Sequence, residues 1–282
     1  MLRFAYNTIG CAHHARRDAL DLIAEAGYQG VTLTLDVHHM NPLDEDYEAA
    51  AERLAADLKA ADLAVAFDAN ARFLLDPRDR QEPSLLSPQE DGRARRVDLI
   101  KRAIRICKIC DGEVVSFTAG RVRRNVSQAN AGAWLLDGLT QIADYGVSEG
   151  VNVALEPEPG HIVSTLDDFT LVRDATKQMT QSPLRLSLDV GHTMITGERS
   201  PHQAVKEFSS VLALVSMADM RTGVHAHLPL GEGDMDLPLI LATLQDVSFG
   251  GLVTVKFPRD SHRADVLIPR SSDWLTENLP SD

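Results

Sequence analysis

Residues 151–189 read VNVALEPEPGHIVSTLDDFTLVRDATKQMTQSPLRLSLD. Two short apolar runs within this stretch, Val151 to Glu156 and Leu184 to Asp189, predict buried strands. Between them Thr165 begins a predicted helix, and Asp168 follows three residues later as its capping-box partner. A strand, a helix and a second strand in this order predict parallel pairing through a crossover connection.

The same unit recurs on both sides of this stretch, with a helical pattern after nearly every strand. The other β-like runs are Arg3 to Asn7, Val31 to Leu35, Leu63 to Phe67, Glu113 to Thr118, Val211 to Met217 and Leu252 to Phe257. Eight such units in 282 residues predict an α/β fold, a single (β/α)8 barrel over residues 1–282, with residues 271–282 as a short C-terminal helix and tail. An open doubly wound sheet is the alternative, but no glycine-rich phosphate turn follows the first strand.

The composition favours a small-molecule partner. The formal net charge of −13 disfavours nucleic acid and anionic membrane surfaces as partners, and no uncharged run approaches the length of a membrane span. The three cysteines are too few for a disulfide framework, so we expect a cytoplasmic protein. Five arginines and Lys101 between Arg93 and Arg105 predict the solvated face of a helix rather than an anion site.

Polar residues stand where predicted strands end, which is where (β/α)8 barrels carry their chemistry. Glu156 ends the fifth run, Asp189 ends the sixth, and His192 follows three residues later. Glu156 or Asp189 alone is also a plausible cap of the helix that follows. The two carboxylates together with His192 favour a functional site. Carboxylate oxygens and imidazole nitrogens suit Mn²⁺, Zn²⁺, Co²⁺ or Mg²⁺. His225 and His227 reach the same place only if the segment after the seventh strand folds back.

A series of segments in this order resembles one family, the xylose-isomerase-like TIM barrels, also called the sugar phosphate isomerase/epimerase superfamily. The segments are Tyr6-Asn7-Thr8, residues 27–39, residues 71–77, residues 156–160, residues 188–192, His225-x-His227-Leu228, Gly231-Glu232-Gly233 and Ser261-His262. The resemblance spans nearly the whole chain and implies the barrel fold. It is suggestive of an isomerase or epimerase.

The resemblance also implies a set of site residues. The family holds one divalent metal with Glu, Asp, His and Glu from the ends of strands five to eight, and Glu156 and Asp189 match the first two ligands. His192 matches a histidine that binds substrate or a second metal. The substrate-binding side chains that the resemblance implies are His38, His39, Asp68, Glu158 and His262.

Three positions depart from the family pattern. Ser216 stands where the seventh strand provides His, Lys256 stands where the eighth provides Glu, and Asp68 replaces a Glu of this branch. Lys256 would repel a divalent cation about 4 Å away by roughly 8 kcal/mol at an effective dielectric constant of about 20. We therefore expect metal binding to be weakened or lost. A salt bridge from Lys256 to Glu156 or Asp189 would then replace the metal, unless His225 and His227 complete a ligand set with Glu156 and Asp189.

Several functions follow from these residues. The candidate catalytic residues are Glu156, Lys256 and His192. The first function is an isomerase or epimerase of a sugar, an inosose or a related carbonyl compound, in which Glu156 is a metal ligand and the proton-transfer base, Asp189 and a loop histidine are further ligands, and the metal polarises the carbonyl. The second is a metal-independent enzyme in which Lys256 is a Schiff-base nucleophile, an electrophile or a general acid with a depressed pKa. The third is a non-catalytic barrel that binds a small molecule. Each of these functions is compatible with a homodimer.

A class II AP endonuclease is the least favoured reading. That chemistry uses a three-zinc cluster with more histidines and carboxylates than this chain retains. The formal net charge of −13 also disfavours a DNA substrate.

Overall fold

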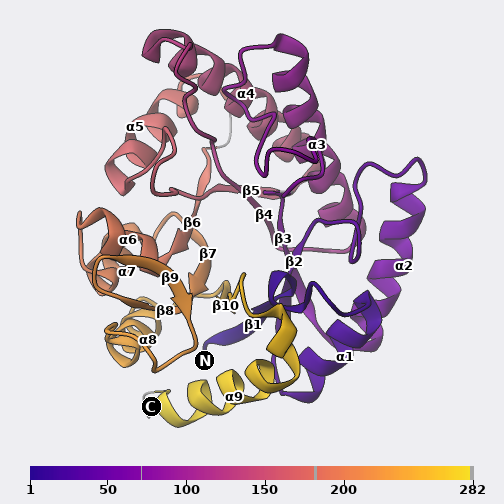
Figure 1. Cartoon of the computed structure of the whole chain (residues 1–282), viewed down its shortest axis with the longest axis vertical. Coiled ribbons are helices and arrows are strands. Elements are labelled where there is room, and N and C mark those ends of the chain that lie inside the picture. Colours follow the sequence, from indigo (N-terminus) through magenta and orange to yellow (C-terminus); the bar gives the residue numbers. More distant parts are fainter. Residues whose placement is uncertain (71, 181–182, 280–282) are drawn as a thin grey trace.

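Eight parallel strands close into a barrel in the computed structural model, which describes residues 1–70, 72–180 and 183–279 (Figure 1). Their order around the barrel is β1-β10-β7-β6-β5-β4-β3-β2, so sequential strands are neighbours and β1 pairs with β10 to close the ring. The strands are β1 Arg3–Asn7, β2 Gly30–Thr34, β3 Ala64–Asp68, β4 Val114–Phe117, β5 Asn152–Leu155, β6 Arg185–Asp189, β7 Leu212–Met217 and β10 Leu252–Val255. The (β/α)8 prediction is confirmed.

Helices surround the barrel and cover the outer faces of its strands (Figure 1). They are α1 Arg16–Glu25, α2 Tyr47–Ala60, α3 Glu90–Ile109, α4 Gln128–Glu149, α5 Leu166–Lys177, α6 Val190–Thr196, α7 Pro201–Phe208, α8 Leu237–Asp246 and α9 Ala264–Asn278, with 3-10 turns η1 Thr8–Cys11 and η2 Ser261–Arg263. Thr165 and Asp168 form the predicted capping box of α5. The C-terminal helix begins at Ala264, earlier than the sequence predicted, and residues 280–282 lie outside the described part of the chain.

The barrel interior changes from apolar to charged along the strands. At the N-terminal end six residues from six strands form one buried cluster, namely Ala5, Ala66, Val114, Ala154, Leu214 and Leu252. One layer further, the hydroxyls of Thr32 and Thr254 meet across the interior at 2.7 Å. Because strand side chains alternate between two faces, the next inward positions after Ala154 and Thr254 are Glu156 and Lys256. The strand period therefore places the charged residues over the packed layers of the barrel.

A two-stranded hairpin follows β7, where the sequence predicted only a loop. Strands β8 Asp219–Arg221 and β9 Val224–Leu228 pair in antiparallel fashion around Gly223, whose φ is 75°. The buried carboxylate of Asp219 holds this segment, because it accepts hydrogen bonds from the backbone N–H groups of Met220, Gly231 and Met235 at 2.9 to 3.1 Å. Gly233 packs against the same carboxylate, and a Cβ there would lie 2.3 Å from Oδ1. The hairpin is thus the fold-back that brings His225 and His227 to the barrel.

The long connection between β3 and α3 is held by a buried arginine. Arg96 lies in the stretch predicted to be a solvated helix face, but it is only 5% exposed. Its guanidinium donates to the carbonyls of Pro83 at 2.8 Å, Gln81 at 3.0 Å and Asn70 at 3.3 Å. The prediction of a wholly solvated face is wrong at this position, because these carbonyls have no helix or sheet partner and recruit the side chain instead.

All three cysteines are buried free thiols. In the described ranges no helix is long and apolar enough to cross a membrane.

Candidate functional site

A buried ion pair occupies the C-terminal end of the barrel. Nζ of Lys256 lies 3.2 Å from Oε1 of Glu156. Both residues directly follow their strands, and their backbone N–H groups continue the ladder to Met217 and Phe117. Their side chains are 6% and 2% exposed. The sequence predicted a salt bridge from Lys256 to Glu156 or Asp189, and the structure contains the one to Glu156.

The charges around this pair keep Lys256 protonated. Burial by itself would lower the pKa of the Lys256 ammonium, but Glu156, then Asp68 and two further carboxylates, outweigh burial and raise that pKa above its usual value. The sequence allowed a depressed pKa for Lys256, and the structure opposes this. Burial raises the pKa of Glu156 to about 7, although Lys256 and His192 oppose the rise. The pair therefore holds one permanent cation and one carboxylate that titrates near neutral pH.

Asp189 is the second buried carboxylate of the site and ends β6. Its Oδ2 lies 3.2 Å from Nε2 of His227 and 3.7 Å from Nε2 of His192, and its Oδ1 accepts from the backbone N–H of Gly191. Burial would raise the pKa of Asp189, but His192 and the hydrogen bond from His227 lower it far below its usual range. Asp189 is therefore an anion at any working pH and anchors two of the three histidines.

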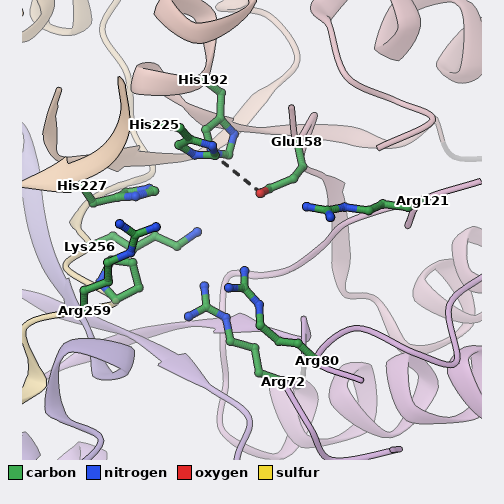
Figure 2. Close-up of a pocket in the computed structure, with 10 residues that line it drawn as sticks. Arg72, Arg80, Arg121, Glu158, His192, His225, His227, Lys256 and Arg259 are labelled. Atoms are coloured by element: carbon green, nitrogen blue, oxygen red, sulfur yellow. Dashed lines mark ion pairs between the residues drawn. The ribbon is translucent and has the colours of Figure 1, made fainter. Parts of the chain in front are cut away.

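His192 has a defined orientation. Its Nδ1 donates a hydrogen bond to the carbonyl oxygen of Pro157 at 2.9 Å, which leaves Nε2 facing Asp189 and Glu158. Nε2 lies 3.8 Å from Oε2 of Glu158, and Figure 2 marks this contact with a dashed line. Burial would lower the pKa of His192, but Asp189 and Glu158 outweigh it and raise that pKa. Burial would likewise raise the pKa of Glu158, yet His192 and Lys256 lower it. Glu158 is therefore ionised at neutral pH.

Three histidines form a cluster beside these carboxylates. Ligand atoms of His192, His225 and His227 lie within 4.8 Å of one another, and the rings of His192 and His225 meet edge to face at 5.1 Å. Glu156, Asp189 and His192 form a second group with the same spacing. His192 belongs to both groups, so an ion that used its Nε2 atom would engage one group or the other.

A cavity of about 220 Å³ opens above this cluster (Figure 2). Its lining consists of Arg72, Arg80, Arg121, Glu158, His192, His225, His227, Lys256, Pro258 and Arg259. Among the described residues, neither Glu156 nor Asp189 belongs to this lining. Glu156 lies behind Lys256 and Asp189 lies behind His227, and both of these partners line the cavity. A molecule in the cavity would therefore meet Lys256, Glu158 and the histidines first.

Four of the lining residues are arginines that the sequence reasoning missed. Arg72 lies four residues beyond β3, Arg121 four beyond β4 and Arg259 four beyond β10, while Arg80 shares the loop of Arg72. The predicted site consisted of carboxylates, histidines and Lys256, and the net charge of −13 gave no sign of a local basic cavity. Arginines placed shortly after barrel strands were the available signal.

The remaining predicted substrate-binding residues do not belong to the lining of the cavity in the described part of the chain. His39 is 1% exposed and its Nδ1 lies 2.8 Å from Oδ2 of Asp36, while its neighbour His38 is exposed. His262 is exposed on η2. Asp68 is buried at the end of β3, where it accepts from the backbone N–H of Asn70 and contributes to the field at Lys256.

Residues 20–278 match the family described as xylose isomerase-like TIM barrel. The chain belongs to this family. An uncharacterised protein of Methanocaldococcus jannaschii is 23% identical over 232 residues, which cover 74% of this chain and 77% of that protein.

Two solved structures share the fold along essentially their whole length. The 3-keto-D-glucoside 4-epimerase YcjR of E. coli superposes with a TM-score of 0.77 at 17% identity, over 98% of this chain and 100% of that chain. A structure of the IOLI protein with a bound zinc atom superposes with a TM-score of 0.72 at 16% identity, over 98% and 96% of the two chains. At such identities the likeness shows the fold.

The strand-end ligand set that the family resemblance implies does not fit a divalent cation in this chain. Ser216 offers a buried hydroxyl in place of an imidazole, and the ammonium of Lys256 already contacts Glu156. A cation beside Glu156 and Asp189 would face that ammonium at close range. The three-histidine cluster has suitable donor chemistry, since neutral imidazole is a ligand for zinc.

Proposed function

We propose that this protein catalyses a proton transfer next to the carbonyl of a small sugar-like compound, as an isomerase or epimerase, with the ammonium of Lys256 in place of a metal. The observation that carries the proposal is the buried contact of 3.2 Å between Nζ of Lys256 and Oε1 of Glu156. It is supported by the epimerase of the same fold and by the position of Lys256 in the cavity lining.

The assignment of roles follows from which groups face the cavity. Glu158 is an ionised carboxylate in the lining and would accept a proton from the carbon next to the carbonyl. As that C–H bond breaks, its electron pair moves toward the carbonyl oxygen, and the Lys256 ammonium donates a hydrogen bond to the developing enolate oxygen. Delivery of a proton from solvent to the opposite face of the same carbon gives the epimer. Delivery of the proton from Glu158 to the neighbouring carbon, with the hydroxyl proton moving to the former carbonyl oxygen, gives the isomer.

Two neighbouring residues, Glu156 and His192, position Lys256 and Glu158. Glu156 holds Lys256 protonated and in place from behind, and His192 contacts Glu158 at 3.8 Å. A Schiff base at Lys256 is disfavoured, because the nucleophile would be the neutral amine and the surrounding carboxylates raise the pKa of the ammonium. Lys256 therefore acts as a fixed cation in this proposal.

A zinc-assisted form of the same reaction is the second candidate, because three imidazoles converge within 4.8 Å. His192, His225 and His227 would hold the ion, which when bound supplies a Lewis acid for a carbonyl oxygen. The structure of the IOLI protein with zinc supports this candidate. Asp189 would then orient His227 from behind, as the partners of metal-binding histidines commonly do.

Solvent deuterium exchange tests the proposal. Protein treated with a chelator is incubated in D₂O with a panel of ketoses, aldoses and inososes, each with and without a phosphate group, and the carbon-bound deuterium is measured by mass spectrometry. We expect incorporation without added metal and a loss of about a hundredfold or more in Lys256→Met and Glu158→Gln. Arg124→Gln, on an exposed residue outside the cavity, is the control. Incorporation that requires added Zn²⁺ and disappears in His225→Ala would establish the second candidate instead.

A further inference from the structure

The basic residues of the cavity converge on one space from three loops. Arg72 and Arg80 enter from the β3–α3 loop, Arg121 from the loop after β4 and Arg259 from the loop after β10. Figure 2 shows the guanidinium groups of Arg72, Arg80 and Arg121 directed toward the centre of the cavity, across from the histidines and Lys256. These positive charges share a cavity of about 220 Å³.

None of these arginines is ion-paired in the described part of the chain, although the carboxylates of Asp68, Glu158 and Glu156 act on Arg72 through their field. The side chains of Arg72, Arg80, Arg121 and Arg259 make no hydrogen bond or ion pair there. Arg123, two residues from Arg121, pairs with Asp79 and Glu82. The lining arginines are thus unpaired in a protein whose acidic residues outnumber its basic ones by 41 to 28.

The charge of the lining is strongly positive. It holds four arginines and Lys256 but a single carboxylate, Glu158, which already faces His192 at 3.8 Å. A cleft whose charges are mostly of one sign concentrates ligands of the opposite sign. An anionic ligand would thus relieve a repulsion that the free protein contains.

The two loops that carry Arg72, Arg80 and Arg121 are tied together, so this part of the cluster is built into the fold. Nε2 of His161 lies 3.1 Å from Oε1 of Gln81, next to Arg80, and its Nδ1 accepts from the N–H of Gly120, next to Arg121, at 3.3 Å. The three hydrogen bonds from Arg96 to backbone carbonyls fix the same β3–α3 loop. A fixed frame of this kind reduces the cost of ordering side chains on binding.

Building on the proposed function, we infer that the substrate is a phosphomonoester, whose phosphoryl group is held by Arg72, Arg80 and Arg121 while its carbonyl end faces Lys256 and Glu158. A guanidinium presents up to five N–H donors in a fixed fork. One carboxylate has two oxygens and satisfies one or two such forks, whereas a phosphoryl group has three terminal oxygens and two negative charges. The cavity is smaller than the roughly 300–1,000 Å³ of sites for drug-sized ligands, which favours a short carbon chain.

The test uses calorimetric titration with inorganic phosphate at constant ionic strength and pH 7.5. We expect saturable binding to the full-length protein that weakens by about tenfold or more in Arg80→Gln and in Arg121→Gln. Arg124→Gln removes the same charge from an exposed position outside the cavity lining and should leave the affinity unchanged. Two results would overturn the inference. One is a heat of binding from acetate equal to that from phosphate, and the other is an equal phosphate affinity in the wild type and all three variants.

A second arm identifies the anion. A sugar phosphate is titrated against its neutral parent sugar and the matching uronate, and binding of the phosphate should be strongest. Stronger binding of the uronate or of the neutral sugar would overturn the phosphomonoester. This result is separate from the proposed reaction. Exchange on neutral sugars without phosphate binding would refute this inference alone, and phosphate binding without exchange on any compound would refute the reaction alone.

Discussion

Lys256 directs its ammonium at Glu156 across 3.2 Å, at the strand ends where the family resemblance predicted metal ligands. The two residues are 100 positions apart in the sequence, and the closed barrel brings them together. Their contact replaces attraction between carboxylates and a metal ion by attraction between a carboxylate and an ammonium. The proposed chemistry and the stability of the site both depend on this pair.

The pair makes a prediction about stability. Glu156→Gln leaves a buried ammonium without its nearest counter-charge, so we expect a loss of about 3–5 kcal/mol in the free energy of unfolding. Lys256→Met should cost less, because Glu156 has a pKa of about 7 and can take up a proton. The double variant should recover to within about 1 kcal/mol of the wild type. Urea unfolding of the four proteins measures this, and additive losses would show that the two residues act separately.

His161 makes a prediction about pH. Burial lowers its pKa to about 4, and the charged groups that face it are Glu158, Arg121, His192 and Arg80. The folded state therefore favours neutral His161, whose contribution to stability is complete above pH 6.5 and is lost as the pH falls toward 4. This contribution should be about 2 kcal/mol smaller at pH 5 than at pH 7.

The measurement compares urea unfolding of the wild type and His161→Gln at these two pH values. The variant should lose about 2 kcal/mol less than the wild type between pH 7 and pH 5. His38→Gln removes an exposed histidine and should follow the wild type. An unchanged pH dependence in His161→Gln would contradict the prediction.

Arg96 makes a prediction about the loop that carries Arg72 and Arg80. Arg96→Met leaves three loop carbonyls without their donor, so we expect the β3–α3 loop to exchange its amide hydrogens faster and the protein to lose about 3 kcal/mol or more of stability. Arg95→Met is the matched control, since exposed Arg95 donates to one carbonyl, that of Leu75. Hydrogen exchange read by mass spectrometry should show the acceleration in Arg96→Met and little change in Arg95→Met. Similar profiles for both variants would refute this role.

The sequence predicted the eight barrel strands to within a residue or two, because buried parallel strands appear as short apolar runs between helical patterns. It also placed Glu156, Asp189 and Lys256 at one end of the barrel, since these residues end or directly follow strands. The same reasoning left Lys256 with two partners, Glu156 and Asp189. Only the closed geometry selects Glu156.

Other features depended on contacts that a linear pattern does not contain. The hairpin of β8 and β9 is held by the Asp219 carboxylate through backbone N–H groups 1, 12 and 16 residues away. The buried position of Arg96 depends on loop carbonyls that no helical period identifies. Arg72 and Arg121 lie on different loops, and their convergence becomes visible only when those loops meet above the barrel.

Mn²⁺ titration followed by electron paramagnetic resonance tests most directly whether Lys256 stands in place of a metal. Mn²⁺ prefers carboxylate oxygens and therefore reports on the strand-end site. We predict no tight Mn²⁺ binding by the wild type, binding of about one ion by Lys256→Glu, and loss of that binding when Asp189→Ala is added. Tight binding of Mn²⁺ by the wild type that disappears in Asp189→Ala would contradict the account.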